Sequence, residues 1–443
     1  MHALRALVLL APLWWGCAGP SQTTRYHALE DAWLRAAPAE AGRADDPFAG
    51  HPTLDRRALI DAVLARNPSI GSARWAWRAA LARHPQETSL DDPMLAYEVA
   101  PLSLTSSRSD DAHRAVLAQA FPFPGKLALR GEIALAEAEA AARDHEAVRL
   151  RLATLASLLY DEHYLIARKL GVNDVHRTLL AELREIAVAR YETGAAAQQD
   201  PLEAELEQAE LLHRDVALRA DQRIVVEQLN ALLHRAPGLP LPAPPPALEV
   251  QAPAEPREAL LARALAERPE LHAAEARVRA RESAVALARR EYLPDYRVMG
   301  GYDGFEEEDE MRPMLGLELN LPLQRSRRTA ALDEAQASLE EARSERSALG
   351  DQVQLSVARV LERLAEAHHA LDVFRDHLLP AARDRVTSAR AAFETGQSDF
   401  STLIDAERRL RDAELGHEEA VVEVSRRHAE LARATGALPG GSR

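Results

Sequence analysis

The sequence repeats its own plan at an offset of about 200 residues, and this repetition limits the folds open to it. A Glu-Thr-Gly phrase at 192–194 returns at 394–396. Three further landmarks return in the same order: 56–68 with 256–269, Pro93 with Pro294, and 121–122 with 321–322. Solenoid repeats have periods of roughly 20–50 residues, which are much shorter. We therefore interpret the chain as two copies of one larger unit.

Each copy has the same predicted order of elements: a moderate helix, an extended hairpin, a very long helix and, after the Glu-Thr-Gly break, a return helix. The copies cover 54–236 and 257–436, and the Pro-rich segment 237–256 connects them. Proline interrupts helices and central strands, so we expect an extended connector. The predicted elements are helices at about 54–84, 126–190, 201–235, 257–291, 326–392 and 401–435, hairpins at about 93–122 and 294–322, and a C-terminal tail at 437–443.

The long helices have the hydrophobic spacing of coiled coils. Steps of three and four residues predict a seam formed by Leu332, Ala335, Leu339, Ala342, Leu349, Val353 and Val360 in the second copy, and by Leu152, Leu155, Leu159, Ile166 and Leu170 in the first. A helix of about 65 residues is about 100 Å long. Such a helix does not fit a compact globule, so we expect a rod or the wall of a tube.

The hairpin segments alternate apolar and polar residues. This pattern occurs in 94–100, 296–302 and 314–321, and the connection 303–312 is too charged to be buried. Strands of about 9–11 residues with one apolar face are typical of membrane β-barrels, although an ordinary hairpin packed on helices has the same pattern. Two hairpins supply four strands, whereas the smallest bacterial barrels have about eight. A membrane barrel therefore requires several copies of this chain.

The N-terminus resembles a bacterial export signal. A basic residue, Arg5, precedes an apolar run and then Gly16-Cys17, so we interpret 1–16 as a signal peptide. The cysteine after a small residue resembles a lipoprotein processing site and predicts lipidation of Cys17, although Trp14 stands where leucine is usual and an ordinary signal peptide remains the alternative. Residues 17–53 are expected to form an extended N-terminal segment.

The remaining composition argues against an enzyme. The net charge is −15 and no basic cluster is interleaved with aromatics, so we expect no nucleic-acid partner. No metalloprotease, nucleophile-elbow, dinucleotide or phosphate-loop motif is present, and we predict no cofactor. His368-His369 and Asp372 have one-turn spacing, but without further ligands we interpret them as a solvated helix face and predict no metal site.

Taken in order, these features resemble the outer-membrane efflux (TolC-like) family. The resemblance rests on the duplication and on the passages 118–140, 293–303 and 393–410. It implies a mainly α protein with membrane β structure: a homotrimer in which a 12-stranded outer-membrane barrel continues as a coiled-coil tunnel into the periplasm. The implied partners are a periplasmic adaptor, an inner-membrane pump of the RND type and outer-membrane lipid. The PFPGKLALRG passage and the lipoprotein-like start resemble the heavy-metal efflux branch most closely.

The resemblance also implies roles for single residues. The two Glu-Thr-Gly breaks correspond to turns at the periplasmic tip, which would place Tyr191, Gly194, Phe393 and Gly396 at the adaptor contact. Asp405 matches an aspartate of the tunnel constriction, and the offset of 202 places Glu203 beside it and Asp200 nearby. Asp200 and Ser401 also suit a helix cap and Glu203 suits a favourable first-turn charge, so these readings stay open.

Two other classes remain as alternatives. A lipid-anchored periplasmic coiled-coil scaffold without channel activity would share the long helices but would form no membrane sheet. A periplasmic adaptor subunit would need further β domains beside a single helical hairpin, whereas this chain has two helical hairpins. The passive channel is the reading that accounts for both hairpins and long helices.

Overall fold

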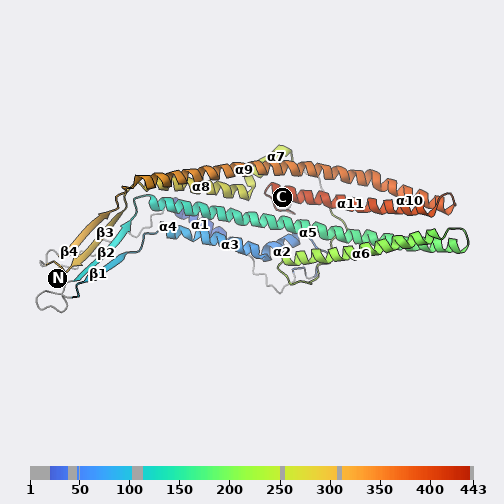
Figure 1. The fold of residues 1–443 in the computed structure, drawn as a ribbon, viewed down its shortest axis with the longest axis horizontal. Coiled ribbons are helices and arrows are strands. Elements are labelled where there is room, and N and C mark those ends of the chain that lie inside the picture. The colour runs from blue at the N-terminus through green and yellow to red at the C-terminus, as the bar shows by residue number, and fades with distance from the viewer. Residues whose placement is uncertain are drawn as a thin grey trace. The chain divides into compact units, whose positions relative to one another are not determined.

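A computed structural model describes residues 20–37, 47–48, 50–101, 113–249, 255–306 and 312–439. This part of the chain is predominantly helical, with one four-stranded sheet (Figure 1). Its elements are α1 (Pro20–Arg35), α2 (Arg56–Arg66), α3 (Pro68–Leu81), α4 (Arg83–Thr88), β1 (Met94–Val99), β2 (His113–Phe121), α5 (Lys126–Glu192), α6 (Gln199–Leu232), α7 (Arg257–Glu267), α8 (Pro269–Arg290), β3 (Tyr296–Asp303), β4 (Pro313–Leu319), α9 (Arg325–Val373), the π-helix η4 (Phe374–Leu378), α10 (Leu379–Glu394) and α11 (Phe400–Ala434).

The chain divides into two compact units. Unit 1 comprises Met1–Ala37, Ala73–His145 and Glu270–Leu349, and unit 2 comprises Pro38–Ser72, Glu146–Pro269 and Gly350–Arg443. Unit 1 contains the sheet and the helical segments next to it. Unit 2 contains the turns between long and return helices. Within the helices that the structure describes, no segment is both long and apolar enough to span a membrane.

Two of the predicted helices are broken at prolines. The helix expected at 54–84 consists of α2, α3 and α4, and the one expected at 257–291 consists of α7 and α8. Asn67 and Arg268, which precede Pro68 and Pro269, have extended backbone angles. The proline ring disfavours a helical conformation for the residue before it, so each helix ends there.

The N-terminal segment corrects one prediction. Residues 17–53 were expected to be extended, but Pro20–Arg35 form helix α1. A helix of this length is marginal by itself in water, and here contacts within unit 1 stabilise it. Arg25 pairs with Glu132 and Glu139 of α5, and the Trp33 indole donates to the Arg74 carbonyl oxygen. These partners are distant in sequence, so the local pattern did not indicate the helix.

The long helices follow the prediction closely, with one internal irregularity. The run from Arg325 to Glu394 is helical throughout but contains the π-helix Phe374–Leu378. Pro380 follows it and lacks the N–H that would bond one turn back, which accounts for the locally widened helix. The predicted seam of α9 is at least half-buried at every position. In α5 Leu155 is 43% exposed in the single chain and does not pack within it, whereas Ala153 and Ala156 are buried.

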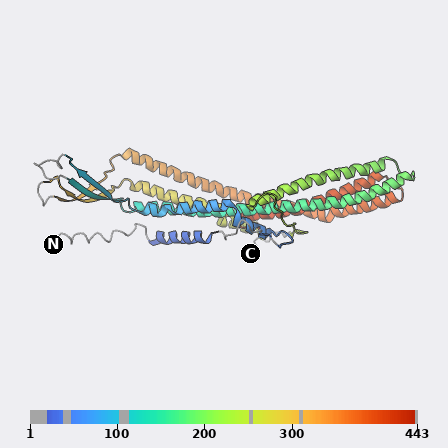
Figure 2. The same cartoon turned by 90° about the horizontal axis from the view of Figure 1, so that it is seen from below.

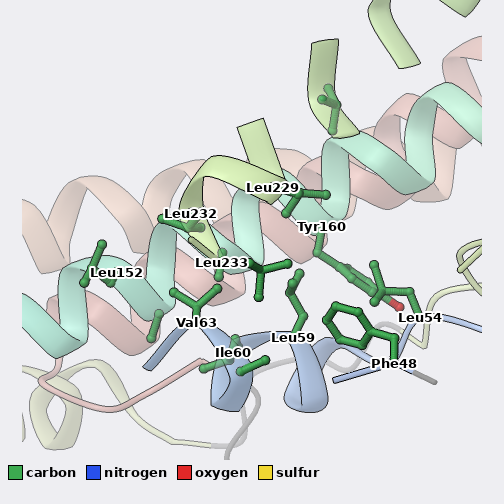
Figure 3. Packing of buried hydrophobic residues seen from close by; sticks show 14 of the residues in the cluster. Phe48, Leu54, Leu59, Ile60, Val63, Leu152, Tyr160, Leu229, Leu232 and Leu233 are labelled. Carbon is green, nitrogen blue, oxygen red and sulfur yellow. The ribbon is translucent and has the colours of Figure 1, made fainter. Parts of the chain in front are cut away.

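Over its described residues 237–249, the connector between the copies contains no helix; it begins with a turn at 237–238, and Ala243 forms an isolated bridge with Thr53. It lies beside a core cluster of unit 2 in which Phe48, Leu54 and Leu59 pack with residues of α5 and α6 (Figure 3). The Leu54 N–H donates to the Ala243 carbonyl oxygen at 2.8 Å, and Asn230 donates to the Leu239 carbonyl oxygen at 2.9 Å. These bonds satisfy backbone groups that the prolines leave without helical or strand partners.

A buried polar cluster joins three helices of unit 2. Asp161 of α5 is fully buried and accepts hydrogen bonds from Arg56 of α2, at 2.5 Å, and from the Ser425 hydroxyl of α11, at 2.9 Å. Arg56 also donates to Ser157, and its guanidinium lies over the Tyr160 ring. A buried carboxylate is tolerated because these donors compensate for lost hydration.

Candidate functional site

Strands from both sequence copies form one antiparallel sheet in the order β1-β2-β3-β4. The central pair, β2 with β3, joins the hairpins, and Phe121 lies opposite Tyr296 in it. Among the described residues, β1 and β4 each have a strand partner on one side only. Unpaired edges present free N–H and C=O groups, so both edges of this sheet are available to other strands.

One face of the sheet is apolar. Side chains of paired residues point to the same face, so the register brings most of the large apolar side chains of the four strands together, with His113 and Gln119 as polar residues among them. The apolar face contains Leu95, Tyr97, Val99, Ala115, Leu117, Phe121, Tyr296, Val298, Tyr302, Leu315, Leu317 and Leu319. Most of these large side chains are exposed, and Leu315 is 92% exposed. An exposed apolar surface of this kind marks a contact with a partner or a membrane.

Aromatic residues lie at both ends of the apolar face. At one end the His113 ring lies 5.7 Å from Tyr302 and 6.3 Å from Tyr97. At the other end Phe121 stacks on Tyr296 at 5.4 Å. Tyr296 and Tyr302 are six residues apart on β3, which corresponds to about 20 Å. Aromatic rows at both borders of an apolar band are typical of membrane β-barrels.

The opposite face, here called the polar face, carries the charged residues of the strands, together with small and apolar ones such as Ala96, Val116 and Met299. Arg114 pairs with Asp303 at 2.5 Å, and Arg297 pairs with Glu318 at 2.9 Å. Glu98 of β1 lies 3.8 Å from Arg114. The alternation therefore places every Asp, Glu and Arg of the four described strands on this face.

A buried lysine holds the sheet to the helices of unit 1. Lys126, at the start of α5, contacts Asp295 at 2.9 Å, Glu291 at 3.1 Å and the Leu293 carbonyl oxygen at 3.1 Å. Asp295 also accepts from the Phe123 N–H at 2.7 Å. This junction links the ends of β2 and α8, and the sequence reading missed it because its members are about 165 residues apart.

The two Glu-Thr-Gly phrases form matching turns in unit 2. Gly194 and Gly396 both have φ of +74°, a left-handed conformation that favours glycine. The Ala195 N–H donates to the Arg190 carbonyl oxygen, and the Gln397 N–H donates to that of Ala392, both at 2.8 Å. These bonds define a Schellman C-cap, which confirms the predicted helix ends. Figures 1 and 2 both show the turns at the same end of unit 2.

Equivalent aromatic residues beside these turns have different environments. Phe393 is 5% exposed and packs on Phe400 at 5.4 Å, whereas Tyr191, at the same position of the first copy, is 44% exposed. The Arg190 guanidinium lies over the Phe393 ring and donates to its carbonyl oxygen at 3.0 Å. The Phe393 side chain therefore belongs to the core of this end, which corrects its prediction as a surface contact; Tyr191 is at the surface.

The three predicted constriction carboxylates lie near this end of unit 2. Burial, and then the nearby Asp399, raise the pKa of Asp200. Burial also raises the pKa of Glu203; Arg408 opposes this shift, and Asp405 and Asp200 add to it. Glu203 is thus close enough to both other carboxylates to feel their charge. Asp405 is exposed and accepts from Arg408 at 3.2 Å.

The sequence reading missed the basic partners of this cluster. Glu207, one turn after Glu203, is buried and pairs with Arg408 at 2.5 Å and with Arg411 at 3.8 Å. Arg408 lies four residues before Asp412 and three after Asp405. Both spacings allow an ion pair on a helix, so the spacing alone did not show which acidic residue Arg408 contacts. The cluster is therefore a mixed ionic network and not carboxylates alone.

Capping by Asp200 and Ser401 is not observed. The N-cap residues of α6 and α11 are Gln198 and Asp399, and neither makes a side-chain capping bond. Asp200 lies in the first turn of α6, where a negative charge is favoured by the helix dipole.

The predicted histidine pair of α9 lies near a third histidine. The His368 ring lies 5.8 Å from that of His428 in α11. Over the described ranges, no group of three His, Cys, Asp or Glu residues is arranged to hold a metal ion.

The long helices and the open amphipathic sheet together define the fold of outer-membrane channels. The chain superposes on the outer-membrane channel OprN (20% identity, 90% of this chain and 97% of that one, TM-score 0.74). It also matches VceC from Vibrio cholerae (18%, 86% and 96%, 0.73) and CusC (16%, 90% and 99%, 0.74). At these identities the similarity shows the fold. A comparison with curated proteins gives no match.

Residues 260–437, in the second sequence copy, match the family model described as outer membrane efflux protein. The resemblance to this family that the sequence indicated is thereby confirmed. Members of the family are passive channels and not enzymes, which confirms the prediction that this chain is not an enzyme.

Proposed function

We propose that this protein is the outer-membrane component of a tripartite efflux system, in which three copies form a passive conduit from periplasm to exterior. The observation that carries the proposal is the apolar face of an open four-stranded sheet, bordered by aromatic residues. An open sheet edge is not tolerated in lipid, so the strands must be completed by other copies. Three copies supply a barrel of 12 strands and place the polar face toward its lumen.

Apolar side chains along α6 support the assembly of several copies. Leu202, Leu206, Leu212, Val216 and Ile224 are all exposed in the single chain. A row of large apolar residues on a helix surface favours packing against another helix. In the proposed trimer, a helix of a neighbouring copy would cover this row.

The apolar face predicts a side-specific effect of charge. We expect Leu315→Arg to destabilise the membrane-inserted trimer by about 2 kcal/mol or more, because arginine on the lipid face of a barrel costs up to ~4 kcal/mol at the bilayer midplane. Met314→Arg is the matched control, since Met314 is the adjacent residue and points to the polar face. Native mass spectrometry in mild detergent measures how much trimer forms, and conductance in planar bilayers measures channel activity.

Equal behaviour of the two variants would show that the apolar face does not meet lipid. Wild-type protein that is only monomeric or dimeric, without conductance, would instead favour the lipid-anchored coiled-coil scaffold.

The turns after α5 and α10 are proposed to form the adaptor contact at the periplasmic tip. Gly194 and Gly396 have open space where a Cβ atom would be, and Tyr191 is exposed beside them. Phe393 supports this surface from the core, where its ring packs on Phe400. The energy for transport would come from the pump, for which the RND type is proposed from the sequence resemblance.

We also propose that Asp200, Glu203 and Asp405 line the tunnel constriction, with metal cations as the exported substrate. Three carboxylates from each of three copies would place nine around a three-fold axis. Rings of acidic side chains favour cations. Arg408 offsets part of this charge in the single chain.

The constriction predicts cation block. We expect divalent or trivalent cations on the periplasmic side to block conductance in planar bilayers, and Asp405→Ala to weaken that block several-fold. Asp221→Ala, an exposed site of equal charge on α6, is the control. An unchanged block in the Asp200→Ala, Asp405→Ala double variant would rule the ring out.

The same block should depend on pH. Because the pKa values of Asp200 and Glu203 are raised, these carboxylates take up protons at a higher pH than ordinary carboxyl groups, whose values are about 4. Lowering the pH should therefore begin to weaken the cation block at pH values above about 4.

The membrane anchor remains a prediction from the sequence. Cys17 and the signal peptide 1–16 lie outside the described residues. We propose lipidation of Cys17 as a second attachment to the outer membrane, in addition to the barrel.

A further inference from the structure

Three arginines lie where the second hairpin joins its helices. Arg289 lies in the last turn of α8, and Arg325 and Arg327 lie in the first turn of α9. The two helix ends lie together, because the Arg328 Nε donates to the Glu291 carbonyl oxygen at 2.7 Å and the Asn320 N–H donates to that of Asp295 at 3.0 Å. We call Arg289, Arg325 and Arg327 the arginine patch.

The arginine patch has no partner among the residues that the structure describes. All three side chains are exposed and make no ion pair or hydrogen bond there. No acidic residue lies three or four positions from any of them, so no helical pairing offsets their charge. The nearby acids Glu291 and Asp295 are already paired with Lys126.

The arginines of α9 oppose the local stability of the helix. A cation in the first turn is unfavourable because the helix dipole is positive there, and this turn contains no acidic residue. Neighbouring Arg328 and Arg290 are bonded to backbone carbonyl oxygens and hold the junction. The arginine patch makes no such contribution, so its charge is available to a group outside the described residues.

The arginine patch continues the apolar face of the sheet. Leu319 ends β4, and Leu321 and Leu323, which lead to Arg325, are strongly exposed. The order along the chain is thus apolar strand, exposed leucines and then cations. This order matches the change from acyl chains to headgroups at a membrane surface, where basic residues attract anionic lipids.

We propose that the arginine patch binds the phosphate groups of anionic phospholipids in the leaflet on the helical side of the membrane. The inference rests on the proposed membrane position of the sheet. Leu321 and Leu323 would contact the acyl chains of the same lipids, and the guanidinium groups would contact their phosphates.

A neighbouring copy is the competing occupant. Asp91 and Asp92 are exposed just before β1, at the opposite edge of the sheet. In a closed barrel this edge meets β4 of the next copy. If these residues formed ion pairs between copies, the trimer would need the arginine patch, and this requirement would be the same in every lipid.

The test compares lipid retention in three forms of the full chain. Trimers are exchanged into nanodiscs containing phosphatidylglycerol and phosphatidylcholine, and lipids that remain bound are counted by native mass spectrometry. We expect wild type to prefer phosphatidylglycerol, and the Arg289→Gln, Arg325→Gln, Arg327→Gln variant to lose about tenfold or more of this preference. The loss should be greatest at low salt. The control, Arg223→Gln, Arg383→Gln, Arg385→Gln, removes three exposed arginines of unit 2 and should behave as wild type.

Equal preference in the two triple variants would overturn the proposal. Dissociation of the patch variant into monomers in every lipid would also overturn it and assign the arginines to a subunit contact. Conductance separates these results from failure of the proposed function: a wild-type protein that forms no channel in any bilayer contradicts the channel itself, and the inference fails with it.

Discussion

Arg56→Ala is expected to lower the free energy of unfolding by about 3–5 kcal/mol, because it removes the cation from the fully buried Asp161. Among the described residues, the substitution leaves this carboxylate, in the interior of unit 2, with the Ser425 hydroxyl as its side-chain donor. Denaturant unfolding followed by far-UV circular dichroism measures the change. Arg57→Ala is the matched control, since Arg57 is the next residue and is exposed. Equal unfolding midpoints for the two variants would contradict a stabilising role of this pair.

The loss of stability in the Arg56→Ala variant should become smaller as the pH falls. Burial raises the pKa of Asp161 above its ordinary value, and Arg56 is the main opposing influence. Without Arg56 the pKa rises further, so the variant takes up a proton at a higher pH than wild type does. Protonation removes the buried charge, and the difference between variant and wild type should therefore shrink as the pH falls. A deficit that is constant from neutral to acidic pH would show that lost packing, not charge, causes it.

Gly396→Trp is expected to reduce efflux at least tenfold while trimers still form. The proposed adaptor surface surrounds this residue, and the indole would project into space that is open in the structure. The test is an export assay in cells with the pump and adaptor present, with trimer levels measured in parallel.

The Gly396→Ala variant separates the effect of backbone strain from the effect of side-chain volume. Both variants have a side chain at a φ of +74°, which costs roughly 1–2 kcal/mol, but alanine adds little volume. We expect Gly396→Ala to keep most of the export activity, and Gly194→Trp to repeat the defect at the equivalent turn. Equal export by Gly396→Trp and Gly396→Ala would show that this surface does not contact the adaptor.

Features that depend on near neighbours could be read from the sequence. The alternation in β4 identified its apolar face, and the Glu-Thr-Gly phrases identified both C-caps, because a strand's faces and a helix end are decided within a few residues. The bounds of α5 and α11 agree with the predicted helices for the same reason. The family assignment rested on the order of such local features.

Features that depend on packing were decided by the tertiary structure alone. Helix α1 forms because Arg25 and Trp33 find partners about 40 to 110 positions away. Phe393 and Tyr191 occupy equivalent positions, but only Phe393 is covered by Phe400. Glu207 became an ionic partner because α11 brings Arg408 and Arg411 to it. Which side chains are buried and which charges pair depends on how elements distant in the sequence pack together. A local sequence pattern does not specify these distant partners.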